Sequence, residues 1–155
     1  PFEKLYEQGY RGVIFDIDNT LVPHGAPADE RAKRLFQRLR EIGFESCLLS
    51  NNQNKLVGMF NQEIQTHYIY NALKPARKNY LHAMEIMGTD QANTLFVGDQ
   101  LFTDVWGAKR VGIHNILVHP INPKEEIQIV LKRYLEKIVL HFYKKSKKRL
   151  KKVAN

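Results

Sequence analysis

Acidic and hydroxyl side chains stand where apolar runs of the sequence end. Asp16 and Asp18 follow the apolar residues 13–15, and Ser50 follows a second apolar run at residues 47–49. Two carboxylates two positions apart in an extended chain point to the same side. They repel each other unless a cation or a proton lies close to them. These positions therefore predict a site that binds a positively charged group.

A lysine and two further carboxylates follow the later apolar runs. Lys74 comes shortly after residues 67–70, and Asp99 and Asp104 follow residues 94–97. Four carboxylates in one place favour a hard cation such as Mg²⁺, which prefers oxygen ligands. With a serine and a lysine they suit phosphoryl transfer, which uses an attacking carboxylate, a proton-moving carboxyl group, a metal and fixed donors. Each residue alone is common at helix starts, so only the ordered set predicts this chemistry.

Five apolar runs alternate with helical patterns along the chain. This alternation predicts an α/β fold, a three-layer α/β/α sandwich with a mainly parallel five-stranded sheet. In such a sheet, ligands bind beyond the carboxyl ends of the strands, where the polar residues above would gather. The predicted strands are residues 13–17, 44–49, 67–70, 94–97 and 114–118, and the predicted helices are residues 29–42, 53–64, 75–87, 103–111 and 123–143.

Three further residues carry structural expectations. Thr103 is predicted to cap the helix at residues 103–111. Trp106 is predicted to lie in the core, and the alternative is a rim that touches acyl chains. Cys47 is the only cysteine of the chain and stands in an apolar run. It cannot form an internal disulfide, which fits a reducing compartment.

The chain is near neutral except at its carboxyl end. Its 155 residues carry 24 Lys and Arg against 16 Asp and Glu, a formal net charge of +8. Residues 144–155 hold 7 of the basic residues and no acidic one, which leaves 17 basic and 16 acidic residues in positions 1–143. We expect a folded domain over residues 1–143 and a basic tail over residues 144–155. No apolar run approaches the roughly 20 residues of a transmembrane helix.

The predicted helix at residues 123–143 is amphipathic and leads into the basic tail. An apolar face followed by lysines suits docking on an anionic membrane surface. A helix that covers the sheet or an oligomer interface, with a solvated tail, is an equally good interpretation. The apolar stripe consists of Ile127, Val130, Leu131, Tyr134, Leu135, Ile138 and Phe142.

Four segments at the predicted strand ends form an ordered set of motifs. Residues 16–22 read DIDNTLV, Ser50 closes the second apolar run, Lys74 is followed by a proline, and residues 98–104 read GDQLFTD. This set resembles the four motifs of the haloacid dehalogenase (HAD) superfamily phosphatases, over about residues 12–118. The resemblance implies a HAD-like Rossmannoid fold and phosphatase chemistry.

The resemblance assigns a role to each motif. It implies that Asp16 is the nucleophile and forms an aspartyl-phosphate, and that Asp18 acts first as the general acid and then as the base. Ser50 would hydrogen-bond the phosphoryl group, and Lys74 would stabilise its charge. Asn19 stands where many family members have glycine.

The resemblance also implies a Mg²⁺ cofactor. Its ligands would be the carboxylates of Asp16 and Asp99, the backbone carbonyl of Asp18, and Asp104 either directly or through a water molecule.

The spacing of the motifs leaves no room for a cap domain. About 30 residues separate the first motif from Ser50, and 23 separate Ser50 from Lys74. The site should therefore be open and suit a phosphate carried by a large partner, such as a lipid headgroup. The motifs also resemble the capless YqeG-like subfamily, which includes phosphatidylglycerophosphate phosphatases. This finer resemblance makes a phospholipid headgroup the leading substrate.

Several polar residues near the motifs are candidates for binding the substrate. Thr20, Asn51, Asn52 and Gln100 are predicted substrate contacts, while His24 is expected in a solvated loop. Basic residues near the predicted site could also contact a headgroup: Lys55, Arg77, Lys78 and Arg110.

Two alternatives remain open from the sequence. One is a capless phosphatase of a soluble sugar or nucleotide phosphate, whose walls come from an oligomer. The other is an RNA- or ribosome-associated protein that uses the basic tail, although the chain lacks the aromatic and basic interleaving of RNA-binding surfaces. We expect a cytoplasmic protein, peripheral on the inner membrane face, or a mitochondrial or plastid protein in a eukaryote.

Overall fold

The structure of the chain is a computed structural model that describes residues 2–122. The chain divides into two compact units, Pro1–Asn122 and Pro123–Asn155. The predicted amphipathic helix at residues 123–143 and the basic tail at residues 144–155 lie outside the described residues.

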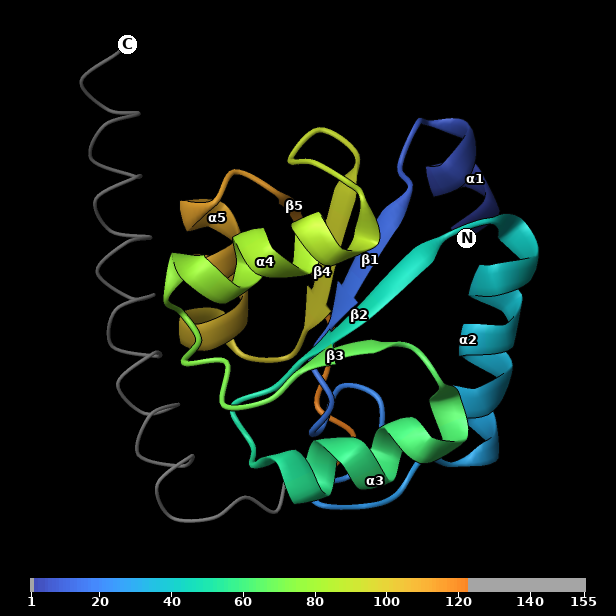
Figure 1. Cartoon of the computed structure of the whole chain (residues 1–155), viewed down its shortest axis with the longest axis vertical. Helices are drawn as coiled ribbons and strands as arrows, with labels where there is room; N and C mark the ends of the chain where they lie inside the picture. The colour runs from blue at the N-terminus through green and yellow to red at the C-terminus, as the bar shows by residue number, and fades with distance from the viewer. Residues whose placement is uncertain (1, 123–155) are drawn as a thin grey trace, which may run out of the picture. The chain divides into compact units, whose positions relative to one another are not determined.

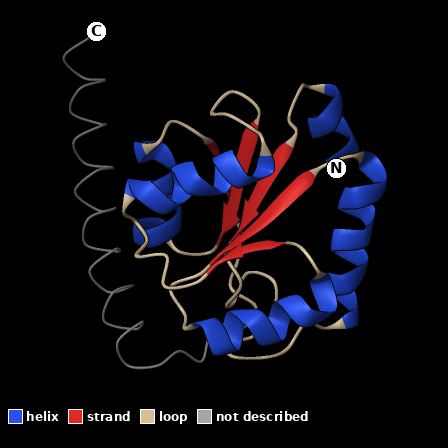
Figure 2. Ribbon diagram, in the orientation of Figure 1, coloured by secondary structure: helices blue, strands red, loops and turns tan. Residues whose placement is uncertain are grey.

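Five parallel strands form one sheet in the order β3-β2-β1-β4-β5, with helices on both sides (Figures 1 and 2). This arrangement confirms the predicted α/β fold and each of its five strands. The elements in chain order are α1 (Phe2–Glu7), β1 (Gly12–Phe15), α2 (Glu30–Ile42), β2 (Glu45–Leu49), α3 (Asn54–Ile64), β3 (His67–Ile69), α4 (Arg77–Met87), β4 (Thr94–Gly98), the π-helical turn η1 (Leu101–Val105), α5 (Trp106–Arg110) and β5 (His114–Leu117).

Alternating strand residues point to two separate cores. Val13 and Phe15 of β1 pack with α2 and α3 on one face, while Ile14 packs with α4 and α5 on the other. All three side chains are buried, because a central parallel strand is covered on both faces. Cys47 lies in the second core, where burial raises the pKa of its thiol to about 12.

The ends of α2 follow from the local sequence. Asp29 stands at its N-cap and accepts a hydrogen bond from the backbone N–H of Ala32 at 2.7 Å. Gly43 ends the helix in the left-handed conformation, with a φ of 105°, which glycine adopts without steric penalty. The predicted helix at residues 29–42 is therefore confirmed to within one residue.

Three predicted details differ from the structure. α1 was not predicted, because its six residues are too few to show a helical period. α4 begins at Arg77 rather than at residue 75, since Ala76 is still extended. Thr103 is not a helix cap: it lies inside η1, where its hydroxyl donates to the Gln100 side chain at 2.9 Å.

The prediction that Trp106 lies in the core is wrong. Its side chain is 51% exposed. In α5 the neighbours Gly107 and Ala108 are buried, and a Cβ on Gly107 would lie 2.2 Å from the Tyr80 hydroxyl. Because the small residues face the sheet, Trp106 and Arg110, four positions apart, share the outer side of the helix. Over residues 2–122, the helices are too short or too polar to span a bilayer.

Candidate active site

The predicted site residues follow the carboxyl ends of neighbouring strands. Asp16 comes directly after β1, Ser50 after β2 and Asp99 after β4, while Lys74 lies in the loop between β3 and α4. Parallel strands bring their carboxyl ends to the same edge of the sheet, so these four residues meet there.

A buried ion-pair network joins two carboxylates to one lysine. The Lys74 amine donates to Asp16 at 2.5 Å and to Asp104 at 2.8 Å. The side chain of Lys74 is 3% exposed, and those of Asp16 and Asp104 are 5% and 0% exposed. Charges this deep are stable only when each has a partner, so the three side chains depend on one another.

A third carboxylate joins this network. Oxygen atoms of Asp16, Asp99 and Asp104 lie within 4.8 Å of one another, and all three residues are buried. Three carboxylates against one lysine leave the group short of positive charge. Burial raises the pKa of Asp16 to about 8, against the opposing effect of Lys74. The carboxylates of Asp104 and Asp16 raise the pKa of Lys74 although burial would lower it.

This donor set fits a hard divalent cation. Carboxylate oxygens are the ligands that Mg²⁺ prefers, and a dication would remove the remaining repulsion among the three acids. Asp18 is not a member of this group of three, so its predicted part in metal binding rests on its backbone carbonyl.

A glycine makes room for Asp104. A Cβ on Gly98 would lie 2.4 Å from an Asp104 carboxylate oxygen, closer than any real contact. The same oxygen accepts a hydrogen bond from the backbone N–H of Gln100 at 3.0 Å. Gly98 and the turn η1 together therefore fix Asp104 against the end of β4.

Two donors and a nearby imidazole surround the carboxylate of Asp18. Asn52 donates its side-chain N–H at 2.5 Å, the backbone N–H of Gly25 donates at 2.9 Å, and Nδ1 of His24 lies 3.2 Å away. His24 was expected in a solvated loop, and although it is exposed there, it also contacts this acid. Residues 18–25 have no helical or strand periodicity, so the sequence does not predict which of their side chains face Asp18.

The turn between Asp18 and Thr20 depends on Asn19. Asn19 has a φ of 59°, in the left-handed region that glycine and asparagine adopt most readily. Its backbone oxygen accepts from the N–H of Ile121 at 2.9 Å, and its side-chain oxygen accepts from the N–H of Asn122 at 3.3 Å. Asn19 therefore joins the first motif to the segment that follows β5.

Each predicted substrate contact already touches another site residue. The Thr20 hydroxyl donates to Asp99 at 3.3 Å. Asn51 accepts from the backbone N–H of Lys74 at 2.7 Å and donates to its carbonyl at 3.3 Å. Asn52 bonds to Asp18, and Gln100 accepts from Thr103. Their roles toward a substrate stay predictions, but their contacts position the motif residues.

Ser50 keeps a donor for an incoming group. Its hydroxyl oxygen accepts from the backbone N–H of Asn52 at 3.1 Å, and the residue is buried. Accepting that bond uses an oxygen lone pair, so the hydroxyl hydrogen can still donate.

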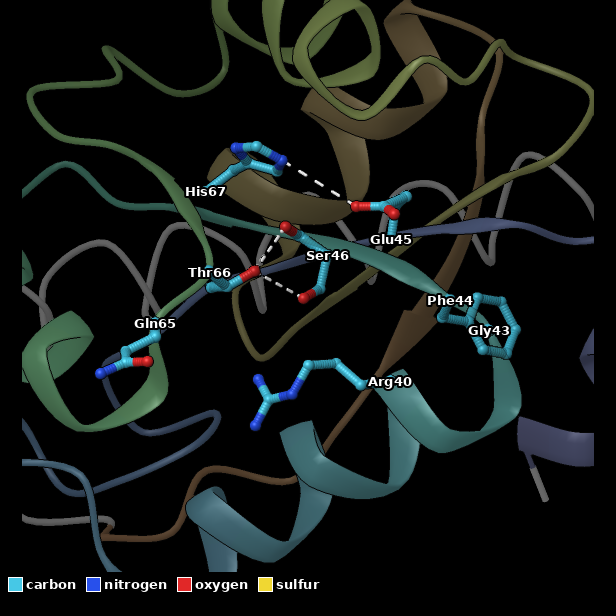
Figure 3. A pocket seen from close by; sticks show the side chains of 8 residues that line it. All are labelled: Arg40, Gly43, Phe44, Glu45, Ser46, Gln65, Thr66 and His67. Atoms are coloured by element: carbon cyan, nitrogen blue, oxygen red, sulfur yellow. Dashed lines mark hydrogen bonds and ion pairs between the residues drawn. The ribbon is translucent and has the colours of Figure 1, made fainter.

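The opposite edge of the sheet carries a pocket of a different kind. This pocket of about 440 Å³ lies at the amino-terminal ends of β2 and β3. The hydroxyls of Ser46 and Thr66 lie 2.6 Å apart and form a hydrogen bond, and Nε2 of His67 lies 3.9 Å from a carboxylate oxygen of Glu45. Figure 3 shows both pairs in the pocket. The pocket contains none of the predicted site residues, so the chemistry is concentrated at the carboxyl edge.

The chain is similar to known phosphatases in sequence. A family model described as HAD-hydrolase-like matches residues 71–120. The probable phosphatase YqeG of Bacillus subtilis is 35% identical over 144 residues, which cover 92% of this chain and 84% of that protein. Phosphatidylglycerophosphate phosphatase 1 of Arabidopsis thaliana is 27% identical over 156 residues, which cover 88% of this chain and 45% of that protein.

Solved structures share the fold. A HAD phosphatase from Thermococcus onnurineus has a TM-score of 0.54 at 18% identity, covering 76% of this chain and 89% of the other. At that identity the likeness concerns the fold alone. The sequence match to YqeG extends over most of both proteins. The chain therefore belongs to the YqeG-like phosphatases of the HAD superfamily.

Proposed function

We propose that the chain is a Mg²⁺-dependent phosphomonoesterase that forms an aspartyl-phosphate at Asp16 and removes the terminal phosphate of phosphatidylglycerophosphate. The observation that carries the proposal is the buried group of Asp16, Asp99 and Asp104 around Lys74. A carboxylate next to a buried cation and to other metal-binding oxygens is suited to attack a phosphoryl group.

The first half-reaction transfers the phosphoryl group to the protein. A carboxylate oxygen of Asp16 forms a bond to phosphorus while the bond from phosphorus to the leaving oxygen breaks. Asp18 gives its proton to that leaving oxygen and becomes a carboxylate. The amine of Lys74 and the hydroxyl of Ser50 donate to the phosphoryl oxygens during the transfer.

The second half-reaction returns the protein to its starting state. The Asp18 carboxylate takes a proton from a water molecule, whose oxygen attacks phosphorus and releases inorganic phosphate from Asp16. Asn52, Gly25 and His24 hold Asp18 at the position from which it serves both steps. Asp16, Asp99, Asp104 and the Asp18 carbonyl would hold Mg²⁺, which when bound neutralises charge on the transferring group.

Two observations support a lipid headgroup as the substrate. The Arabidopsis relative is named for phosphatidylglycerophosphate, and it matches 88% of this chain. Over residues 2–122, the loop after β1 and the segment between β2 and β3 contain no inserted domain that could enclose a small metabolite. A phosphate presented at a bilayer surface could therefore reach the edge of the sheet. As part of this proposal, the protein acts from the cytoplasm at the inner face of a membrane, or in a mitochondrion or plastid if the organism is eukaryotic.

The test compares lipid and soluble substrates with matched variants. Phosphate release is measured from phosphatidylglycerophosphate in anionic vesicles, from glycerol 3-phosphate and from an aryl phosphate, with Mg²⁺ or with EDTA. We expect Mg²⁺-dependent release, fastest on the lipid. Asp16→Asn should reduce it by at least roughly 1,000-fold. Glu45→Gln, at the opposite edge, is the control and should retain full activity.

Two outcomes would contradict the proposal. Unchanged activity in a folded Asp16→Asn protein would show that Asp16 is not the nucleophile, and the proposed mechanism would then be rejected. Faster turnover of soluble phosphates than of the lipid would retain the mechanism and reject the lipid substrate.

A further inference from the structure

An exposed leucine lies next to the lysine of the site. Leu73 is 73% exposed, the largest value among the exposed large hydrophobic residues of the described chain. Its φ is 52°, in the left-handed region that is costly for a side chain of this size. The next residue, Lys74, reaches inward to Asp16. The backbone thus turns one side chain into the site and the preceding one into solvent.

A tryptophan and an arginine continue this surface. The guanidinium of Arg110 lies 5.2 Å from the centre of the Trp106 ring and donates to the carbonyl of Pro75 at 3.2 Å. Arg110 therefore joins α5 to the loop that carries Leu73 and Lys74. We call the exposed residues Leu73, Trp106, Arg77, Lys78 and Arg110 the rim patch.

The charges of the rim patch all have one sign. Residues 65–84 contain Lys74, Arg77 and Lys78 but no Asp or Glu, and α5 contains Lys109 and Arg110 but no acid. An incoming anionic surface therefore meets cations beside the site, while the acids that bind metal are buried behind them.

We propose that the rim patch docks on an anionic lipid bilayer and brings Lys74 to the headgroup layer. This inference rests on the proposed function, because it names the surface through which that site would reach its substrate. Leu73 and the indole of Trp106 enter the boundary between headgroups and acyl chains. Arg77, Lys78 and Arg110 stay among the lipid phosphates.

Lipid fits the patch better than a nucleic acid does. A nucleic acid would be held by stacking on aromatic rings along a basic groove. Leu73, the most exposed of the large hydrophobic residues that the structure describes, is aliphatic and cannot stack on a base. An exposed aliphatic side chain such as Leu73 gains free energy by entering an apolar environment such as the acyl chains of a bilayer.

Trp106 provides a direct measurement because it is the only tryptophan of the chain. The full-length protein is mixed with vesicles of phosphatidylcholine alone or with phosphatidylglycerol, and with brominated lipids that quench indole fluorescence. We expect a blue shift and quenching on the anionic vesicles. Leu73→Asp should weaken the partitioning roughly tenfold, and Asp tolerates the left-handed conformation well enough for the variant to fold.

A matched control separates this surface from other exposed leucines. Leu56 is also exposed, in the first turn of α3, whose buried residues belong to the core on the other face of the sheet, and Leu56→Asp should bind vesicles like the parent protein. Vesicle binding without any change in Trp106 fluorescence would overturn the proposal, because the contact would then lie elsewhere. An equal response to neutral vesicles, or a response to an RNA oligonucleotide alone, would also overturn it.

The activity on a soluble aryl phosphate is measured in the same samples. If the proposed phosphatase mechanism is wrong, the parent protein releases no phosphate from this aryl phosphate, whatever its response to lipid. If only the rim patch is wrong, this activity is intact while the fluorescence of Trp106 is unchanged by lipid.

Discussion

The two edges of the sheet carry similar residue types in different surroundings. At the carboxyl edge, Asp16 and Lys74 pair in the interior. At the amino edge, Glu45 and His67 face each other at the surface, and the nearby Arg40 donates to the carbonyl of Ile64. Charges in water interact weakly, whereas charges removed from water interact strongly with a ligand or with each other. Burial, rather than residue type, therefore makes the carboxyl edge suited to chemistry.

The same asparagine arrangement occurs at both edges. Asn51 accepts from the backbone N–H of Lys74 and donates to its carbonyl, and Asn61 makes the same two bonds with Thr66. One arrangement holds the site lysine, and the other holds a threonine that bonds to Ser46. The pair allows a structural effect to be separated from a catalytic one.

Removal of the buried cation should give the largest difference between the edges. Lys74→Met leaves Asp16 and Asp104 without their partner, so we expect activity to fall roughly 100- to 1,000-fold. Without metal, the free energy of unfolding should fall by about 3–5 kcal/mol. Urea unfolding in EDTA and phosphate release measure both. Arg40→Met at the amino edge is the control, and an equal loss of stability there would contradict the comparison.

A methyl group at Gly98 should weaken metal binding. The added Cβ would displace the Asp104 carboxylate, so we expect Gly98→Ala to bind Mg²⁺ roughly 10- to 100-fold less tightly. Titration calorimetry measures the affinity. Gly58 in α3 is the matched position, because its nearest neighbour is 3.8 Å from a built Cβ. Gly58→Ala should keep the Mg²⁺ affinity and gain about 0.5–1 kcal/mol of stability.

The two asparagines should differ in activity and agree in stability. Asn51→Ala and Asn61→Ala each lose two hydrogen bonds to backbone, so both should destabilise the fold by about 1–2 kcal/mol. Only Asn51→Ala should lower kcat, by roughly tenfold, because it releases the backbone of Lys74. A comparable loss of kcat in both variants would show that kcat falls because the fold is destabilised, and not because Lys74 is no longer positioned.

Over a single pH unit, the smallest effect concerns the free energy of unfolding in the absence of metal. The pKa of Asp16 is about 8 in the folded protein, against roughly 4 for an unfolded aspartate. Between these values the folded state binds more protons, so the free energy of unfolding should fall as the pH rises, by at most about 1.4 kcal/mol per pH unit. Urea midpoints in EDTA measure this slope. Asp16→Asn should flatten it and Glu45→Gln should not; a slope that survives in Asp16→Asn would argue against the assignment.

Most of the site was predictable because it depends on strand ends. Once the sequence places Asp16, Ser50 and Asp99 after parallel strands, the geometry of the sheet brings them to one edge. Lys74 was predictable for the same reason, although its pairing with Asp104 depends on the shape of η1 and could not be read from spacing.

Other contacts had no signal in the sequence. His24 and Gly25 reach Asp18 through an irregular loop, which has no period to reveal which residues face the site. The sequence favours a core position for Trp106 over a rim position, but the small neighbours Gly107 and Ala108 occupy the inner side of the short helix α5. Packing against Tyr80 decided that orientation, and composition alone does not show it.

Asn19 gives the first motif a second task. Glycine would allow the same left-handed turn between Asp18 and Thr20, but it has no side chain to receive the N–H of Asn122. Replacing Asn19 with glycine would thus keep the geometry of the turn but remove one of its two hydrogen bonds to the chain beyond β5. The bond from the N–H of Ile121 to the backbone oxygen would remain, and the bond from the N–H of Asn122 to the side chain would be lost.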